Sequence, residues 1–219
     1  MIAIVTPVYA NASTLPALAQ RLGAALDVTW TLRFVVDAPP DDSLAVASRL
    51  AAGDERLSVT ELATNVGQNR ALLAGLAAEP AAGAWVCLDA DLQDPPEAVP
   101  LLLGRLGRGD VHVVFAGRRG AYEGRVRLLT GRMHRSALSR ISGVPADAGA
   151  FLAMDRRARE VLLALDPPSI VAGVGVGGLR SDSVPVMRDP RPSGRSAWTA
   201  SNRLRQSART LAWAVNPRR

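Results

Sequence analysis

Hydrophobic and polar positions follow two alternating periods along the first hundred residues. Short apolar runs predict buried strands at 2–6, 29–37, 57–62 and 85–88. Between these runs, apolar residues recur at helical spacing over 13–26, 43–52 and 68–78. Strands and helices that take turns predict βαβ units, because parallel strands need crossover connections. We therefore expect an α/β fold in which helices flank a Rossmann-like, mostly parallel central sheet.

The second half of the chain has a less regular pattern. It predicts a helix over 95–106, a strand over 111–116, and then a loop and a helix over the arginine-rich stretch 118–140. Further strands are expected at 151–154, 170–176 and 183–187, with a helix over 157–165. Because Pro185 interrupts the last of these strands, that strand belongs at an edge of the sheet.

The C-terminal residues differ from the rest of the chain. The stretch 188–195 is rich in turn residues and is expected to be mobile, and a helix is predicted over 197–215. We assign residues 1–190 to one domain, and 191–219 to a mobile loop and a terminal basic amphipathic helix. The apolar residues of that helix form a narrow stripe at Leu204, Ala208, Leu211 and Val215. Two interpretations stay open, a helix attracted to an anionic membrane surface or a helix that packs on the sheet.

Charge is distributed unevenly along the 219 residues. The chain has 48% hydrophobic residues, which excludes global disorder, and its 26 basic residues are all arginine. Residues 1–104 carry 5 Arg and 12 Asp or Glu, whereas residues 105–219 carry 21 Arg and 8 Asp or Glu. A basic half indicates an anionic partner. No nucleic acid is expected, because aromatic residues, on which single-stranded bases stack, make up 4% of the chain.

Other compositional features point to the cytoplasm. Cys87 is the only cysteine, so no internal disulfide can form, and a reducing compartment is the default. The N-terminal residues lack the pattern of a secretory signal, and no run approaches the roughly 20 apolar residues of a membrane span. We expect a cytoplasmic protein, with a peripheral place on the inner face of the membrane if the terminal helix binds lipid.

Polar residues follow each of the first four predicted strands. In open α/β sheets, ligands bind beyond the carboxyl ends of the strands, so these residues are the first candidates for a site. They are Thr6, Pro7 and Tyr9, then Asp37, then Asn65 and Gly67, and finally Asp89, Asp91 and Gln93. For Gly67, and for Gly75 in the helix that follows, helix packing is favoured over ligand approach.

The segment LDADLQD (88–94) carries the strongest chemical signal. In an extended segment, Asp89, Asp91 and Gln93 would project to one side. Their oxygen atoms suit Mg²⁺ or Mn²⁺, which take few protein ligands and complete their shell with water and substrate phosphates. The alternative is that the segment only starts a helix, with Asp94 as the N-cap and Glu97 in the first turn. We adopt that alternative for Asp94 and Glu97, and metal and diphosphate binding for Asp89 and Asp91.

Four motifs in this order resemble family 2 glycosyltransferases of the GT-A fold, and most of all the dolichol- or polyprenyl-phosphate mannosyl- and glucosyltransferases. They are VTPVY (5–9), NVGQNRALLAGL (65–76), LDADLQDPPE (88–97) and AGRR (116–119). The resemblance covers about residues 1–155. It implies a nucleotide-diphospho-sugar donor, a divalent metal ion, and inverting transfer of the sugar to a lipid phosphate.

The resemblance also implies roles for single residues. Pro7, Tyr9 and Asp37 would form the nucleoside pocket, beside Asn65 and Gly67. Asp89, Asp91 and Gln93 would hold the metal and diphosphate, near the backbone of Ala90. Arg118 and Arg195 would contact the phosphates of the donor, and Arg132 and Ser136 would hold the phosphate of the acceptor.

Two departures from the family pattern affect the donor pocket. The usual pair of aspartates after the second strand is reduced to Asp37, because Ala38 replaces the second one, and Asp41 or Asp42 is a candidate substitute. The acidic residue expected soon after Tyr9 is replaced by Asn11. The class of donor, a nucleotide-diphospho-sugar, is therefore better defined than the identity of its nucleotide base.

The sequence leaves three hypotheses open, which differ in the acceptor and in whether the protein is a catalyst. A lipid phosphate is already anionic and needs no general base, whereas a hydroxyl acceptor does. Asp147, in GVPADAGAF, is the candidate base, and a turn residue is the equally weighted alternative. The hypotheses are therefore transfer to a polyprenyl phosphate, transfer to a hydroxyl of a small molecule or secondary metabolite, and a protein that binds nucleotide sugars without catalysis.

Overall fold

The computed structural model describes residues 1–119, 139–141, 143–189 and 200–217. In its first half the elements are β1 (Ile2–Val8), α1 (Leu15–Ala25), β2 (Trp30–Asp37), α2 (Ser43–Gly53), β3 (Leu57–Leu62), α3 (Gln68–Ala78), β4 (Ala84–Cys87), η1 (Pro96–Ala98) and α4 (Val99–Leu106). Then follow β5 (Val113–Arg119), β6 (Leu152–Met154), α6 (Arg156–Leu165), α7 (Ile170–Val176), β7 (Ser181–Met187) and α8 (Ala200–Val215). The predicted alternation of strands and helices is confirmed through residue 116.

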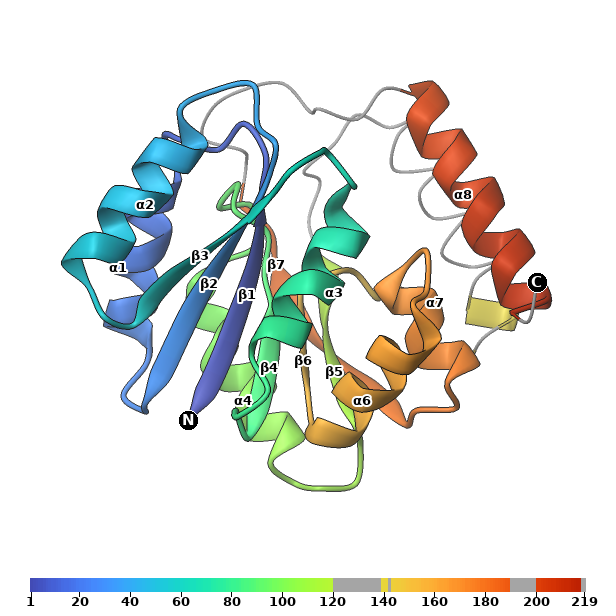
Figure 1. The fold of residues 1–219 in the computed structure, drawn as a ribbon. Coiled ribbons are helices and arrows are strands. Elements are labelled where there is room, and N and C mark those ends of the chain that lie inside the picture. Colours follow the sequence, from blue (N-terminus) through green and yellow to red (C-terminus); the bar gives the residue numbers. More distant parts are fainter. Residues whose placement is uncertain (120–138, 142, 190–199, 218–219) are drawn as a thin grey trace.

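The seven strands form one sheet in the order β3-β2-β1-β4-β6-β5-β7. The pairs β3-β2, β2-β1 and β1-β4 are parallel. The short strand β6 is antiparallel to both β4 and β5, so β5 points the same way as β4, and β7 is parallel to β5. All the strands except β6 therefore end at one edge of the sheet, the upper edge in Figure 1. The mostly parallel α/β sheet is confirmed, as is the edge position of the strand that contains Pro185.

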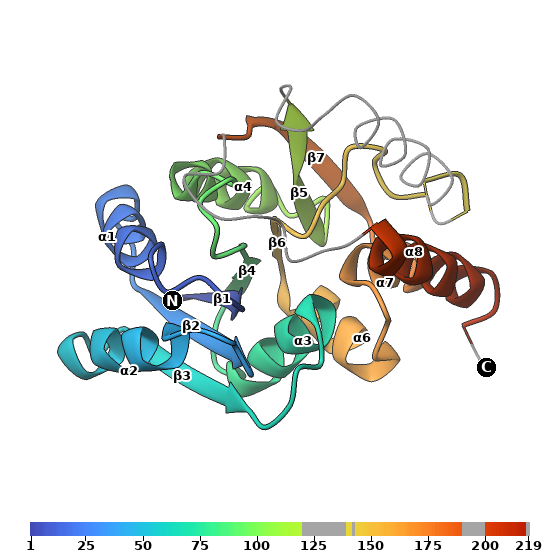
Figure 2. The same ribbon diagram turned by 90° about the horizontal axis from the view of Figure 1, so that it is seen from above.

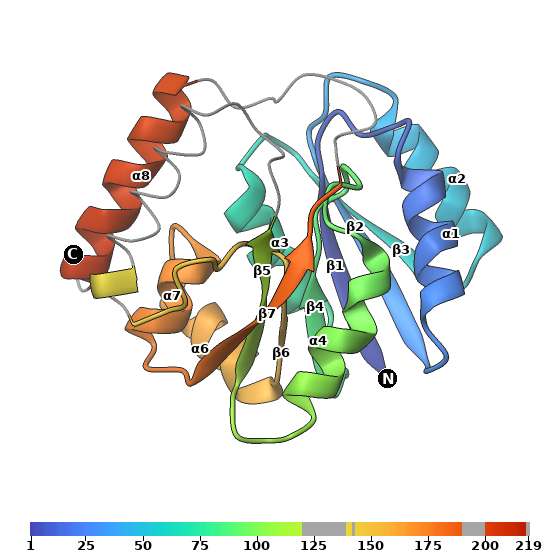
Figure 3. The same cartoon turned by 180° about the vertical axis from the view of Figure 1, so that it is seen from behind.

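Helices cover both faces of the sheet, as Figures 2 and 3 show. Alternate residues of β1 serve the two sides: Ile4 belongs to the core cluster beneath α1, α2 and α4, and Val5 to the cluster beneath α3, α6 and α7. The helix α3 lies very close to the sheet at Gly75, where an added Cβ would come within 2.3 Å of a Val5 methyl group. The packing role predicted for Gly75 is confirmed.

The segment 170–176 is the helix α7, and its prediction as a strand is wrong. Periodicity cannot distinguish a short, fully apolar run of a strand from a turn of buried helix. Ile170, Gly173 and Val174 lie on one buried helical face. An added Cβ at Gly173 would come within 2.6 Å of Pro167, so the glycine allows α7 to pack closely against the turn that precedes it.

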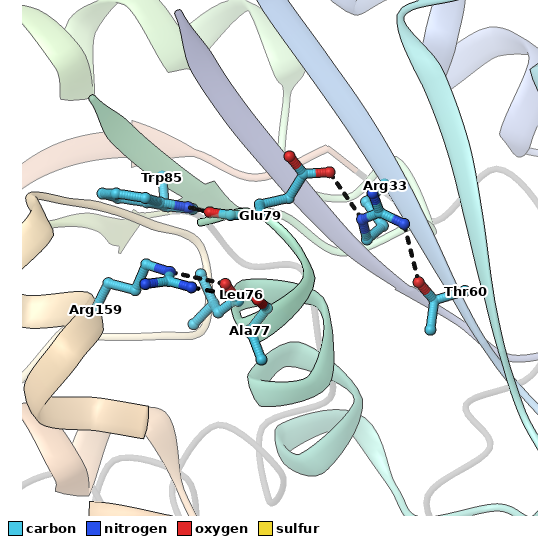
Figure 4. A network of polar contacts seen from close by, with 7 residues as sticks. All are labelled: Arg33, Thr60, Leu76, Ala77, Glu79, Trp85 and Arg159. Carbon is cyan, nitrogen blue, oxygen red and sulfur yellow. Dashed lines mark hydrogen bonds and ion pairs between the residues drawn. The ribbon is translucent and has the colours of Figure 1, made fainter. Parts of the chain in front are cut away.

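The far end of α3 is fixed by side chains from neighbouring elements (Figure 4). The guanidinium of Arg159, on α6, donates to the carbonyl oxygens of Leu76 (2.8 Å) and Ala77 (3.3 Å). The indole of Trp85 donates to the Glu79 carbonyl (2.7 Å), and Arg159 lies 5.1 Å from the centroid of its ring. A cation at the last carbonyls of a helix also interacts favourably with the helix dipole. The opposite end of α3, which starts after Gly67, is thereby held at the upper edge of the sheet.

The helix α8 lies against α7 and the core. Thr210 is 2% exposed, Leu211 and Trp213 pack against the core cluster, and Gln206 donates to the Pro168 carbonyl (2.7 Å). Of the predicted apolar stripe, Leu211 packs against the core, whereas Ala208 and Val215 are exposed. None of the described helices is both long and apolar enough to cross a bilayer.

Candidate active site

The upper edge of the sheet brings together residues that lie far apart in the sequence. Pro7 pairs with Val35 near the ends of β1 and β2, and Asp37 is the last residue of β2. The acidic segment, residues 88–94, starts directly after β4. Arg118 lies within the strand β5 and not in the loop that was predicted there. Because these strands share one direction, the donor-side residues and the backbone of Arg118 meet at the same edge.

The loops after β1 and β2 are joined by hydrogen bonds around Ser43. The hydroxyl of Ser43 donates to Asp41 Oδ1 (2.6 Å) and accepts from the Asn11 amide (2.9 Å). The other carboxylate oxygen of Asp41 accepts from the Ala12 amide (3.2 Å). Burial alone would raise the pKa of Asp41, but these hydrogen bonds lower it. Asp41 and Asn11 therefore hold the two loops together beside Tyr9, whose side chain is exposed.

Asp37 holds the turn that leads into α3. Its carboxylate is buried and accepts hydrogen bonds from the amides of Val66 (2.7 Å) and Gly67 (2.8 Å). The Asn65 side chain donates to the Asp37 carbonyl (3.1 Å). Gly67 has φ +85°, and an added Cβ would meet nothing within 4 Å. The packing role predicted for Gly67 is therefore wrong, and the glycine is needed for its backbone conformation.

Three other residues at this edge adopt the left-handed conformation without being glycine. They are Ala10 (φ 56°) after β1, Ala38 (φ 44°) after β2, and Leu92 (φ 58°) after β4. Such a conformation costs an L-residue about 1–2 kcal/mol. Strained backbone of this kind concentrates at functional sites, where the surrounding structure holds it in place. The conformations of these three residues thus single out the same edge as the polar side chains do.

The acidic segment after β4 is a turn and not an extended chain. The left-handed Leu92 reverses its direction, so the predicted projection of alternate side chains to one side is wrong. The Asp89 carboxylate accepts a hydrogen bond from Gln68 Nε2 at the start of α3 (2.6 Å). Asp91 Oδ1 accepts a hydrogen bond from the backbone N–H of Gln93 (3.1 Å). The carbonyl of Ala90 accepts from the Thr14 hydroxyl (2.6 Å).

Asp94 is not the N-cap that the sequence predicts. Pro95 takes the cap position of η1, and no side chain caps it. The Asp94 carboxylate is buried and accepts from the Arg188 Nε (2.6 Å). A buried carboxylate needs a partner, because taking its charge out of water is costly. Glu97 lies in the first turn of η1, as predicted, and makes an exposed ion pair with Arg21 (2.7 Å).

The donor atoms of this segment fit a hard divalent cation. Asp89 and Asp91 are half-buried, and Gln93 is buried. Mg²⁺ is commonly held by one or two carboxylates together with substrate phosphates, and these two aspartates supply that set. Over the described ranges, no group of three or more His, Cys, Asp or Glu residues is arranged to hold a metal. A cation bound here would complete its coordination shell with water or with oxygen atoms of a phosphate ligand.

Asp147 lies over the β5-β7 pair. Its Oδ1 accepts from the Ser183 hydroxyl on β7 (2.9 Å). An added Cβ at Gly117 would come within 2.5 Å of the other carboxylate oxygen of Asp147. The side chain of Asp147 thus occupies space that only a glycine leaves free, one residue before Arg118. Of the remaining predicted site residues, Arg132, Ser136 and Arg195 lie outside the described residues.

Several residues at this edge were missed by the sequence analysis. Gln68 and Thr14 contact the acidic segment, Arg188 pairs with Asp94, and Gly117 makes room for Asp147. The motifs NVGQNRALLAGL and AGRR contain Gln68 and Gly117, so a signal for these two residues was present. No pattern in the sequence singles out Arg188 among so many arginines.

Comparisons with known proteins identify relatives among bacterial glycosyltransferases. The chain is 30% identical over 214 residues to the uncharacterized glycosyltransferase YkcC of Bacillus subtilis (strain 168), covering 93% of this chain and 65% of that protein. It is 34% identical over 161 residues to the undecaprenyl-phosphate 4-deoxy-4-formamido-L-arabinose transferase of Sodalis glossinidius (strain morsitans), covering 71% of this chain and 49% of that protein. The chain thus spans between half and two thirds of the length of these two relatives.

The fold is shared with a solved enzyme. Glucosyl-3-phosphoglycerate synthase from Mycobacterium tuberculosis, in complex with Mn²⁺, uridine diphosphate and phosphoglyceric acid, superposes with a TM-score of 0.72 at 21% identity. The match covers 99% of this chain and 78% of that one. The model of the family described as "Glycosyl transferase family 2" matches residues 3–162. With its parallel sheet and the polar groups at the upper edge, the chain belongs to glycosyl transferase family 2.

Proposed function

We propose that this protein transfers a sugar, with inversion, from a nucleotide-diphospho-sugar to a polyprenyl or dolichyl phosphate. The observation that carries the proposal is the pair of half-buried carboxylates, Asp89 and Asp91, at an edge where the loops are already held by hydrogen bonds. The family membership supports the class of donor. The name of the Sodalis relative, which is an undecaprenyl-phosphate sugar transferase, supports a lipid phosphate as acceptor.

The chain's own residues would bind and orient the donor. Tyr9 and Pro7, next to the loops joined by Ser43 and Asp41, would contact the nucleoside. Asp89 and Asp91, with Gln93, would hold Mg²⁺ or Mn²⁺, which when bound would neutralise charge on the diphosphate. Groups prepositioned where charge develops lower the barrier without reorganising during the reaction.

The arginine-rich half would bind phosphate groups of both the donor and the acceptor. We assign Arg118 and Arg195 to the phosphates of the donor, and Arg132 and Ser136 to the phosphate of the acceptor. The acceptor phosphate is anionic near pH 7, so it could attack the anomeric carbon without a general base.

The direct test is release of nucleoside diphosphate. Purified protein would be incubated with a panel of nucleotide sugars and Mg²⁺ or Mn²⁺, with and without polyprenyl phosphate. We expect release that depends on both the metal and the lipid phosphate. Metal-dependent binding of nucleotide without release under any acceptor would instead support the non-catalytic alternative. Absence of any nucleotide-sugar binding would contradict both.

A second candidate function rests on Asp147. Its carboxylate is half-buried, accepts from Ser183 and lies against Gly117, the strand position before Arg118. A carboxylate held in this way could take a proton from a hydroxyl group of a soluble acceptor. If the acceptor is a hydroxyl, Asp147→Asn should abolish transfer, and lipid should be irrelevant. If the acceptor is a phosphate, the same variant should keep most of its activity.

We also propose that the outer face of α8 contacts anionic lipid. Arg205 and Arg209 are exposed on that face, and Val215 is 71% exposed. Arginines near an anionic bilayer contribute about 1 kcal/mol each to binding. The protein should therefore co-sediment with vesicles of phosphatidylglycerol. The double variant Arg205→Gln and Arg209→Gln should stay in the supernatant. Equal binding to neutral vesicles would contradict this role.

A further inference from the structure

Arg188 lies beneath the acidic segment and has no part in the function proposed above. It directly follows β7, yet its side chain is only 6% exposed. Its Nε donates to Asp94 Oδ1 over 2.6 Å, across 94 residues of sequence. The next amide, that of Asp189, donates to the carbonyl of Gln93 (2.8 Å). The chain after β7 is thus attached at two points to the segment that follows β4.

The guanidinium of Arg188 interacts with more than one carboxylate. Burial alone would lower the pKa of Arg188, but the charges of Asp94, Asp89 and Asp91, with the hydrogen bond to Asp94, raise it. Arginine remains charged under all conditions in which proteins fold. The two aspartates proposed to hold the metal therefore have a permanent positive charge close by, inside the protein.

A fixed charge at this place has two electrostatic consequences. It repels a divalent cation, so it weakens binding of the metal by Asp89 and Asp91. The charge of Arg188 also attracts a diphosphate, because it offsets the repulsion between the diphosphate and the carboxylates of Asp89, Asp91 and Asp94. Salt screens such effects between charges near a protein surface, and it screens them less when the charge is buried.

We propose that Arg188 is a built-in cation of the diphosphate site, which gives the protein an affinity for nucleoside diphosphates that persists when divalent metal is removed. The inference rests on the proposed function, because it assumes that the diphosphate binds at Asp89 and Asp91. Arg188 is a positioning residue: it acts through the carboxylates and through the charge of the site. The site is thus less dependent on metal than one built from carboxylates alone.

The test compares nucleotide binding with and without metal. Calorimetry with UDP and GDP as probes would give the ratio of the dissociation constant in EDTA to that in Mn²⁺. For the wild-type protein we expect measurable binding in EDTA. In Arg188→Gln we expect the ratio to rise about tenfold or more. In Arg188→Lys, which keeps the charge but loses the Nε contact, the ratio should stay near the wild-type value.

A second measurement separates charge from folding. Binding of Mn²⁺ to the nucleotide-free protein, followed by electron paramagnetic resonance, should tighten in Arg188→Gln, because a repelling charge is gone. A purely structural role would predict weaker Mn²⁺ binding, since the turn would lose its anchor. Arg56→Gln is the matched control: it removes the same charge from the opposite edge of the sheet, beside Trp30, and should change neither quantity.

Three outcomes would overturn the inference. They are wild-type binding that vanishes in EDTA, an Arg188→Gln ratio equal to that of Arg56→Gln, and an Arg188→Lys variant that behaves like Arg188→Gln. The first needs no variant, so it decides the question even if Arg188→Gln fails to fold. Failure of every nucleoside diphosphate in a panel extended beyond UDP and GDP to bind with Mn²⁺ present would overturn the proposed function itself, which distinguishes the two failures.

Discussion

The two halves of the upper edge are built in different ways. Along β1 to β4, carboxylates are held by partners in neighbouring loops: Asp37 by the amides of residues 66 and 67, and Asp89 by Gln68, which is 21 residues away. Along β5 to β7, the described contacts join distant segments, such as Asp94 and Arg188, 94 residues apart. The first half is assembled by contacts between loops that follow neighbouring parallel strands, whereas the second depends on the chain after β7 reaching back to the segment after β4.

This difference explains why one half was easier to interpret than the other. The donor-side contacts join loops that directly follow predicted strands, and the polar residues of those loops stand out in the sequence as compact motifs. The acceptor side depends on space between strands, as at Gly117 and Asp147, and such space leaves little trace in a linear pattern. We therefore expect substitutions in the first half to change how the donor is bound. Substitutions in the second half should change the positions of side chains between the strands.

The largest effect is expected on the donor side, at Asp91. Asp91→Asn keeps the size of the side chain but removes the charge that would hold the metal. Transfer, measured as release of nucleoside diphosphate, should fall about 100-fold or more. Glu97→Gln makes the same change at a nearby exposed ion pair and should leave transfer unaltered. Wild-type activity in Asp91→Asn would show that the metal assignment is wrong.

Two glycine substitutions would sharpen the contrast between core and site. In Gly75→Ala the new Cβ would overlap Val5 and Val35 in the core, so the free energy of unfolding should fall by about 1–3 kcal/mol. In Gly117→Ala the overlap is with the ends of the Asp147 and Ser183 side chains, which can move. This variant should lose less stability, measured by denaturant unfolding, and more transfer activity per folded molecule. The reverse order would contradict a functional place for this end of β5, where Arg118 follows Gly117.

A smaller and favourable effect is expected at Ala38. Its φ of 44° is strained for alanine, and the residue is exposed. Ala38→Gly should raise the free energy of unfolding by about 0.5–1 kcal/mol, after the greater flexibility of glycine in the unfolded chain is taken into account. Ala10→Gly offers the same test after β1. A loss of stability in both variants would mean that the left-handed conformation costs less free energy than the flexibility that glycine adds to the unfolded chain.

The smallest effect concerns pH and the loops joined by Asp41. Because hydrogen bonds lower the pKa of Asp41 in the folded state, its carboxylate stabilises the fold above its unfolded pKa of about 4. That contribution is lost as the pH falls through the lower, folded pKa. Asp41 is exposed, so the change should amount to less than about 1 kcal/mol. Unfolding of wild type and Asp41→Asn at pH 7 and pH 3 should show a larger difference at pH 7 than at pH 3.

Prediction from sequence succeeded where periodicity and local turns decide the structure. The strand-helix alternation through residue 116 and the placing of polar residues at strand ends follow from that information. It failed at residues 170–176, because a short apolar run fits both a strand and a buried helix. It failed at Asp94, whose local surroundings suit a helix cap but whose partner, Arg188, is supplied by a strand at the far edge of the sheet.

The position of Cys87 gives the protein an internal reporter of strand opening. This thiol is fully buried in β4, where it pairs in register with Val5 on one side and Leu152 on the other, and it precedes Asp89 by two residues. Burial, and then the charge of Asp89, raise the pKa of Cys87, so the thiol is protonated and inert in the folded protein. A thiol reagent can therefore react only when β4 separates from its neighbours, and the labelling rate measures how often that happens. Since the acidic segment continues from this strand, a bound nucleotide should slow the labelling.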